Sequence, residues 1–220
     1  MNDIQYKIVR SNRKSIALVI DGRANLVIRA PNNIKDSDIS CLIAKKKRWI
    51  AEKQHKVSVF NEKHSPVIIE TGESVLYIGN TYTIMKNSNP EVQFSSANIL
   101  VPNEFSKADM VVWMKEEAKK ILLERVNNYA SLMGVNYSEL HLSDAKARWG
   151  SCSAKGSLNL SWRLIMCPIA VIDYVVVHEL SHIEYKNHSS CFWARIKTIL
   201  PNYKEQQEWL RLNQNLMEII

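Results

Sequence analysis

The chain has 220 residues, of which 46% are hydrophobic and 23% charged, a composition typical of a folded globular protein and not of a disordered one. No uncharged stretch approaches the roughly 20 residues that a membrane-spanning helix needs, so no membrane partner is expected. The net charge of +7 attracts anions, which makes nucleic acid and nucleotides candidate partners for a basic surface.

The amino-terminal segment MNDIQYKIVR lacks the apolar run of a secretory signal, and the four cysteines do not show paired spacing. Both observations favour a reducing compartment, so the predicted location is the cytoplasm.

The first hundred residues read mainly as β-structure. Segments such as YKIVR, SIALVID and NLVIRAP are rich in β-branched residues and are separated by turn-forming residues. From Asp36 to about His55, apolar residues recur at helical spacing with basic residues between them, and a solvated helix face is the simplest explanation of those charges. Short strand-like segments then return as far as NILVP, which ends at Pro102.

A long helical pattern runs from Lys107 to Met133, with Gly134 as a plausible C-cap. Because the pattern changes here, we expect two lobes, a mainly β lobe at residues 1–105 and a second lobe at residues 106–220. In the second lobe, residues 139–145 and 158–164 read as two strands joined by a turn-rich segment, which predicts a small antiparallel sheet. The predicted fold class is therefore α+β.

The next helix, which we expect to begin after Pro168, carries the segment HELSH at residues 178–182. Residues four apart lie about 40° apart around a helix, so His178 and His182 point from one face. Imidazole nitrogen binds zinc, and a hydrolytic zinc site keeps one position open beside three protein ligands. Glu179 lies about 100° round the helix, off the ion, where a general base for zinc-bound water belongs. The alternative is that both histidines satisfy hydrogen bonds in the core.

The third ligand is less closely defined by spacing. His188 lies six residues beyond His182, so it reaches the same ion only where the helix ends first, for example at Lys186 and Asn187. His188 is the preferred ligand. Three acidic residues remain as alternatives, namely Glu184, Glu205 and Glu208.

Two segments together, RWGSCSAKGSLNLSWRLI and YVVVHELSHIEYKNHSSCFW, make the chain resemble the YgjP-like metallopeptidase family, relatives of the SprT-like and WLM zinc proteases. The resemblance covers nearly the whole length. It implies a zincin-like second lobe with an active-site helix, zinc ligands His178, His182 and His188, and Glu179 as the catalytic acid/base. The chain departs from the family pattern at Ser161, where Asn is expected, and at Ala147, where a small polar residue is expected.

Zincins bind substrates by strand addition, so the predicted strand from Leu158 to Arg163 is a candidate edge for an extended peptide. Arg148, Asn159 and Tyr185 are the candidate substrate-binding residues. For Arg148 and Asn159, packing within the hairpin is an equally good explanation. A developing oxyanion needs a donor besides zinc, and Tyr185 or Arg148 would supply it.

The predicted function is that of a zinc-dependent metallohydrolase, with Zn²⁺ as cofactor and a peptide or protein as substrate. Two alternatives stay open. The basic charge suggests a metal-dependent hydrolase of nucleotide phosphoanhydrides, or a nucleic-acid-associated module with structural zinc. Structural zinc sites use four protein ligands, whereas three histidines and an adjacent acid leave one position open.

Overall fold

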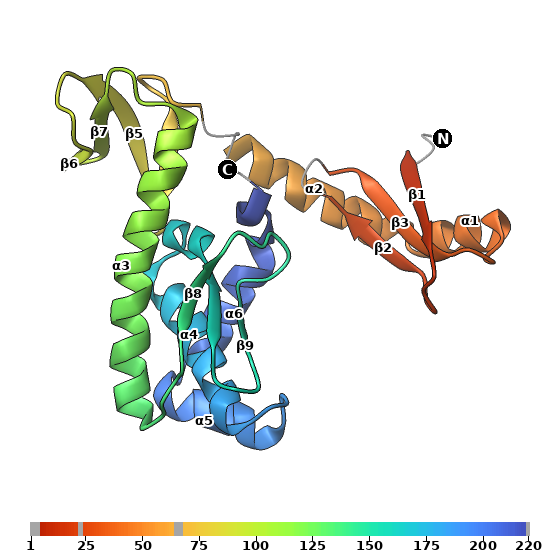
Figure 1. The fold of residues 1–220 in the computed structure, drawn as a ribbon. Coiled ribbons are helices and arrows are strands. Elements are labelled where there is room, and N and C mark those ends of the chain that lie inside the picture. The colour runs from red at the N-terminus through yellow and green to blue at the C-terminus, as the bar shows by residue number, and fades with distance from the viewer. Residues whose placement is uncertain (1–4, 22–23, 64–67, 219–220) are drawn as a thin grey trace. The chain divides into compact units, whose positions relative to one another are not determined.

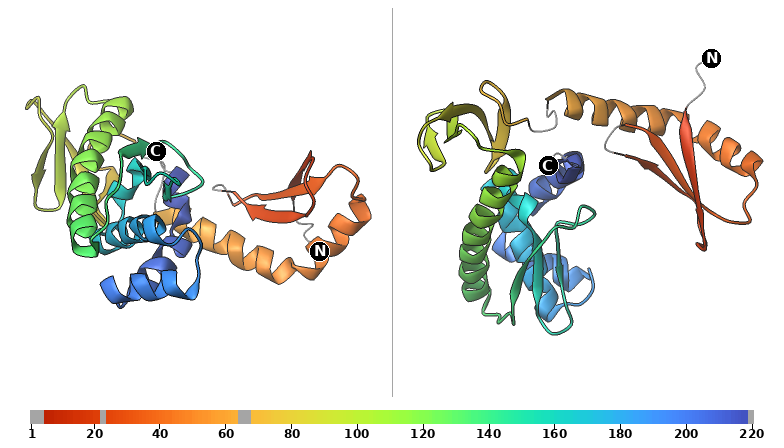
Figure 2. Two further views of the ribbon diagram at one scale, coloured as in Figure 1. Left: turned by 60° about the horizontal axis from the view of Figure 1, so that its bottom comes forward. Right: turned by 45° about the horizontal axis from the view of Figure 1, so that its top comes forward.

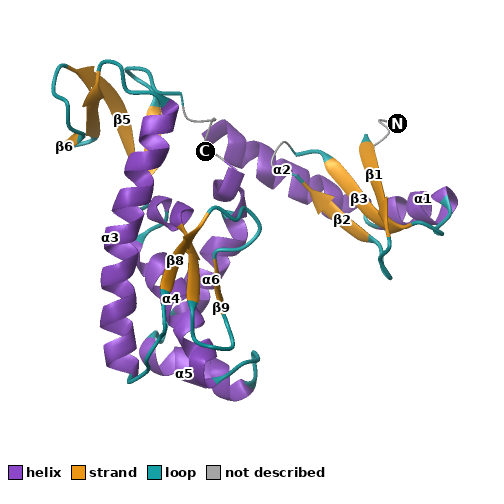
Figure 3. Ribbon diagram, in the orientation of Figure 1, coloured by secondary structure: helices purple, strands orange, loops and turns teal. Residues whose placement is uncertain are grey.

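The computed structural model describes residues 5–21, 24–63 and 68–218. These residues form six α-helices, two short 3-10 helices and three small sheets (Figures 1 and 3). Each sheet contains one parallel pair of strands beside antiparallel pairing. The predicted α+β class is confirmed. The chain divides into two compact units, residues 1–65 and 66–220.

The first unit consists of one sheet and two helices. Its strands are β1 (Tyr6–Ser11), β2 (Ala17–Ile20) and β3 (Leu26–Pro31), in the order β1-β3-β2, and its helices are α1 (Asp36–Lys45) and α2 (Lys47–Lys63). One face of the sheet packs on the helices through a buried aliphatic cluster of Leu26, Ile28, Ala30, Ile39, Ile43 and Ile50. The single helix expected from Asp36 is thus two helices, which meet at Lys46.

The second unit begins with a four-stranded sheet in the order β4-β5-β7-β6. Its strands are β4 (Ser74–Tyr77), β5 (Asn80–Asn87), β6 (Gln93–Ser95) and β7 (Asn98–Pro102). The sheet packs on helix α3 (Lys107–Met133), where the Tyr77 ring lies 5.3 Å from the Trp113 ring and the Tyr77 hydroxyl donates to Glu117 at 2.9 Å. The predicted boundary between residues 105 and 106 lies between β7 and α3, that is, between the four-stranded sheet and the helix on which it packs. This boundary stays a prediction.

Helix α3 has the bounds that its sequence predicts. Ser106 accepts a hydrogen bond from the backbone of Asp109, whose carboxylate accepts one from the Ser106 backbone, and this capping box starts the helix. Gly134 ends it in the left-handed conformation, at φ 66°. The helix flanks the third sheet and the C-terminal helices in every view (Figures 1 and 2).

The third sheet consists of β8 (Leu140–Ser143), β9 (Gly150–Cys152) and β10 (Leu158–Ser161), in the order β8-β10-β9. The prediction of an antiparallel sheet is wrong for β8 and β10, which pair in parallel. The physical reason is that β9 runs back along the sheet before β10 inserts between β8 and β9.

This order also corrects the expected edge strand. Because β10 has a partner on each side, it offers no free edge to a peptide. It also ends at Ser161, and Arg163 lies in the 3-10 helix η1 (Trp162–Met166) that follows. The edges of this sheet are β8 and β9.

The remaining elements are α4 (Ile169–Glu184), α5 (Ser190–Ile199), α6 (Tyr203–Leu212) and η2 (Gln214–Glu218). Helix α4 is the most enclosed, with buried residues throughout 171–177, and it contacts β9, α5 and α6. Asp173 ties it to α3 by accepting two hydrogen bonds from Arg125, each 2.6 Å long. No helix among the described residues is long and apolar enough to cross a membrane.

Candidate metal centre

The centre is built where α4 ends and the chain turns into α5. Tyr185, at φ −119° and ψ 103°, leaves helical geometry, and Ser189 caps α5 by accepting a hydrogen bond from the backbone N–H of Phe192. Helix α4 therefore ends at Glu184, shortly before the Lys186–Asn187 pair at which the sequence suggests a break. This break returns His188 to the helix face that carries His178 and His182.

The structure brings the three histidines together. One ring nitrogen from each of His178, His182 and His188 lies within 4.8 Å of the others, and no other such group of potential ligands occurs among the described residues. The Nε2 atoms of His178 and His188 are 3.1 Å apart. Two nitrogens bound to one zinc at about 2.0–2.1 Å in tetrahedral geometry lie about 3.3 Å apart, so this pair has the spacing of two ligands of one zinc ion, and three imidazoles are a donor set that zinc accepts.

Hydrogen bonding and burial keep these imidazoles suited to metal binding. His182 Nδ1 lies 3.0 Å from the carbonyl oxygen of Tyr185 and donates to it, which leaves Nε2 free for an ion. Burial, followed by the neighbouring His182 and His188, lowers the pKa of His178 to about 3. Burial also lowers the pKa of His182. Neutral imidazole is the form that ligates a metal.

The aromatic ring of Phe192 contacts all three imidazoles. Its centroid lies 5.0 Å from that of His178, 4.6 Å from that of His182 and 4.8 Å from that of His188. Phe192 is fully buried, and the next residue, Trp193, stacks on His188 at 5.6 Å. Sequence reasoning missed both residues, although an aromatic pair soon after the third histidine is a usable signal.

None of the three acidic alternatives belongs to the cluster. Glu184 accepts a hydrogen bond from Arg195 at 2.9 Å, and Glu208 pairs with Arg211. Glu205 is exposed in the first turn of α6.

Glu179 is buried beside strand β9, with 6% of its surface exposed. Burial raises the pKa of its carboxyl to about 7, and the opposing charge of Arg148 reduces that rise. Gly150 makes room for this carboxylate, because a Cβ atom there would lie 2.7 Å from Glu179 Oε1 and 2.8 Å from its Cγ. Sequence reasoning missed Gly150, whose role depends on this close approach.

The three predicted substrate-binding residues have different surroundings. Arg148 is exposed and close enough to Glu179 to affect its pKa. Asn159 is paired with His141 and Ser151 in the sheet, and strand alternation puts its side chain on the face opposite Leu160 and away from α4. Tyr185 contributes its carbonyl oxygen to His182.

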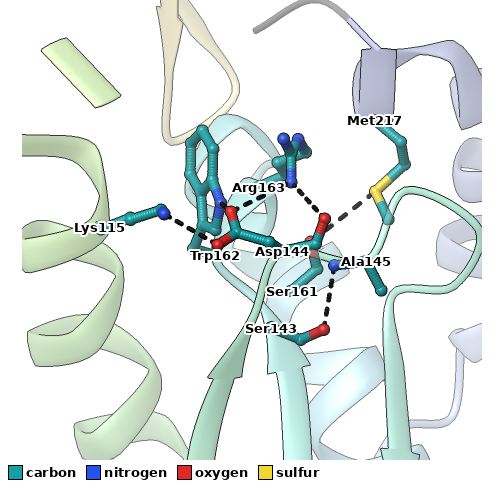
Figure 4. Close-up of polar contacts among 8 residues, drawn as sticks. All are labelled: Lys115, Ser143, Asp144, Ala145, Ser161, Trp162, Arg163 and Met217. Atoms are coloured by element: carbon teal, nitrogen blue, oxygen red, sulfur yellow. Dashed lines mark hydrogen bonds and ion pairs between the residues drawn. The ribbon is translucent and has the colours of Figure 1, made fainter. Parts of the chain in front are cut away.

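Asp144 anchors the segment that connects β8 to Arg148 and Gly150 (Figure 4). Its carboxylate accepts hydrogen bonds from Trp162 Nε1 at 2.6 Å and from Lys115 Nζ at 2.9 Å, and its carbonyl accepts one from Arg163 at 3.1 Å. The bonds from Lys115 and Trp162 lower the pKa of Asp144. These contacts join the residue that follows β8 to α3 and η1. Sequence reasoning missed this contact too.

Two solved structures similar to this chain are archaeal metallopeptidase zymogens. Abylysin from Pyrococcus abyssi is 20% identical with a TM-score of 0.39, and the match covers 42% of this chain and 95% of that one. Jannalysin from Methanocaldococcus jannaschii is 21% identical with a TM-score of 0.38, covering 43% and 96%. No curated protein matches the chain.

The family model described as "YgjP-like, metallopeptidase domain" matches residues 14–213. This match spans both units, and it confirms the resemblance that the two sequence segments carry. The chain therefore belongs to the YgjP-like metallopeptidase domain family.

Proposed function

We propose that this chain is a zinc-dependent peptidase of the HExxH type. The observation that carries the proposal is the convergence of His178, His182 and His188 beside the buried carboxyl of Glu179. Membership of a metallopeptidase family supports a peptide or protein substrate. A zinc ion held by the three imidazoles would supply a Lewis acid that lowers the pKa of water and polarises a carbonyl.

The residues around the bound ion would then have separate catalytic roles. Glu179 acts as the general base that takes a proton from the attacking water and passes it to the leaving amine. Gly150 leaves the space in which that carboxylate lies. Arg148, whose positive charge is felt at Glu179, is one donor for the developing oxyanion, and the Tyr185 side chain is the other candidate.

The edge strand β9 is the better candidate for strand addition. It pairs with β10 on one side, and the described residues provide no strand on its other side. It also contacts α4, which carries Glu179. A substrate added to this edge as an extended strand would run past the base.

The test is a direct comparison of substrates. Purified chain, loaded with zinc, is incubated with a fluorogenic peptide library and with nucleoside triphosphates, each with and without a chelator. We expect peptide cleavage that a chelator abolishes and added zinc restores. Turnover of nucleotides alone would contradict the peptidase proposal and favour phosphoanhydride hydrolysis.

Gly150→Ala tests the position of the base. The added methyl group would displace the Glu179 carboxylate, because that flexible end gives way more easily than the strand. A shift of about 1 Å at a catalytic group costs roughly 100-fold in rate, so we expect kcat to fall by about that factor at unchanged zinc affinity. Steady-state peptide hydrolysis and zinc titration measure the two quantities.

Ser151→Ala is the matched control, because Ser151 follows on the same strand with its side chain on the opposite face. It should behave like the unmodified chain. A fully active Gly150→Ala variant would show that the base does not need this position.

A further inference from the structure

The positive charge of the chain belongs to its first unit. Residues 1–65 contain 14 basic and 6 acidic side chains, whereas residues 66–220 contain 15 and 16. The first unit therefore carries a net charge of +8 and the second −1, which together give the +7 of the chain. The unit with the candidate metal centre contributes none of the positive excess.

The densest group of these charges lies where α1 meets α2. Lys45, Lys46, Lys47 and Arg48 follow one another, and all four side chains are exposed. Together with the neighbouring Trp49, which is 38% exposed, we call them the α1–α2 corner.

Backbone hydrogen bonds and a buried neighbour hold the α1–α2 corner in place within the first unit. The backbone N–H of Lys46 donates to Leu42 at 3.0 Å, and that of Ile50 donates to Lys46 at 2.9 Å, so hydrogen bonding continues from one helix into the other. Ile50 is fully buried in the aliphatic cluster. The basic side chains are thus presented on a fixed backbone.

Stability of the fold does not account for this group. Arg48 pairs with Glu52 at 2.9 Å, but the three lysines have no carboxylate partner among the described residues. The acidic residues of α1, Asp36 and Asp38, lie in its first turn, at the end remote from the corner. Four positive charges in a row raise the local positive potential, which attracts anions to this part of the surface.

We propose that the α1–α2 corner binds single-stranded nucleic acid, with its lysines on the phosphates and Trp49 stacked on a base. Basic side chains that neutralise phosphates supply affinity without reading sequence, and an exposed aromatic ring stacks on any base. A rigid corner that offers both suits an unpaired strand, because bases within a duplex already stack on one another.

The inference is independent of the proposed peptidase activity, because the corner contains none of the residues assigned to that activity. Binding is therefore measured on the full chain with Glu179→Gln, which removes the predicted base and leaves the first unit unchanged. Failure of either proposal would leave the other intact.

The probes are labelled single-stranded DNA and RNA longer than about 16 nucleotides, the upper site size of one binding domain, and a DNA duplex of the same sequence. Fluorescence anisotropy gives the affinity between roughly 50 and 200 mM salt. Changing Lys45, Lys46 and Lys47 together to Gln should reduce the slope of log K against log salt by about 2, since each phosphate contact contributes about 0.7. Trp49→Ala should weaken single-strand binding about tenfold and leave duplex binding unchanged.

The matched control changes three exposed lysines of α3, Lys107, Lys119 and Lys120, to Gln, and it should leave both affinity and slope unchanged. Circular dichroism verifies the fold of each variant. The proposal is overturned by a chain that binds no single strand at the lowest salt. Equal weakening by the two triple variants, or binding to anionic lipid vesicles without binding to nucleic acid, overturns it as well.

Discussion

Glu179→Gln is expected to lower kcat for peptide hydrolysis by about 10³-fold and to leave zinc affinity unchanged. General base catalysis by a positioned side chain contributes about 10²–10⁴-fold, and glutamine has the same shape but cannot accept a proton. Bulk water cannot easily take over the role of the lost base, because the Glu179 side chain is buried and only 6% exposed. Steady-state kinetics with a cleaved peptide, together with zinc analysis of the purified variant, provides both measurements.

Glu184→Gln is the control for this substitution. Glu184 lies on the same helix, is exposed, and loses only a surface ion pair with Arg195 on substitution. Such pairs contribute about 0–1 kcal/mol, so rate and zinc content should stay close to those of the unmodified chain. A fully active Glu179→Gln variant would refute the assigned base, and loss of zinc from it would indicate a ligand instead.

The second large effect is expected from His188→Ala. Removing one of three nitrogen donors should lower zinc affinity by more than about 100-fold, since even the partners that merely orient ligands are worth about 10–100-fold. Peptide hydrolysis should be lost at the zinc concentrations that saturate the unmodified chain. Competition with a chromogenic chelator measures the affinity.

His141→Ala provides the comparison, because His141 is exposed on β8. Among the described residues, the hydrogen-bond partner of its side chain is Glu139. Zinc affinity should not change in this variant. Glu205→Gln and Glu208→Gln complete the set. Weakened zinc binding in either of them, combined with tight binding in His188→Ala, would assign the third ligand to α6.

The parts of the fold that local chemistry defines were predictable. Lys107 to Met133 shows helical periodicity, and Gly134 ends the helix as its residue type indicates. Strand β9 was not predictable, because Gly-Ser-Cys has no β-branched residue and becomes a strand only by pairing with β10. Without β9, the order of the sheet and the parallel pairing of β8 could not be inferred.

The candidate site also combines features that local sequence determines with features that depend on distant contacts. The helical repeat alone puts His178 and His182 on one face, whereas the position of His188 depends on where α4 ends. Gly150 and Asp144 have no local signal, because their roles arise from contacts with distant segments. Tyr185 was considered for its side chain, yet its carbonyl oxygen is what contacts His182.

The contact of Phe192 with three imidazoles links the donor atoms to the packing of α5. The ring is fully buried, so it can leave the imidazoles only when α5 moves away from α4. The position of His188 and the docking of α5 are consequently linked, because His188 directly precedes the Ser189 cap of that helix. Any perturbation that detaches α5, wherever in the unit it originates, will also move His188 away from the two histidines that α4 holds on one face.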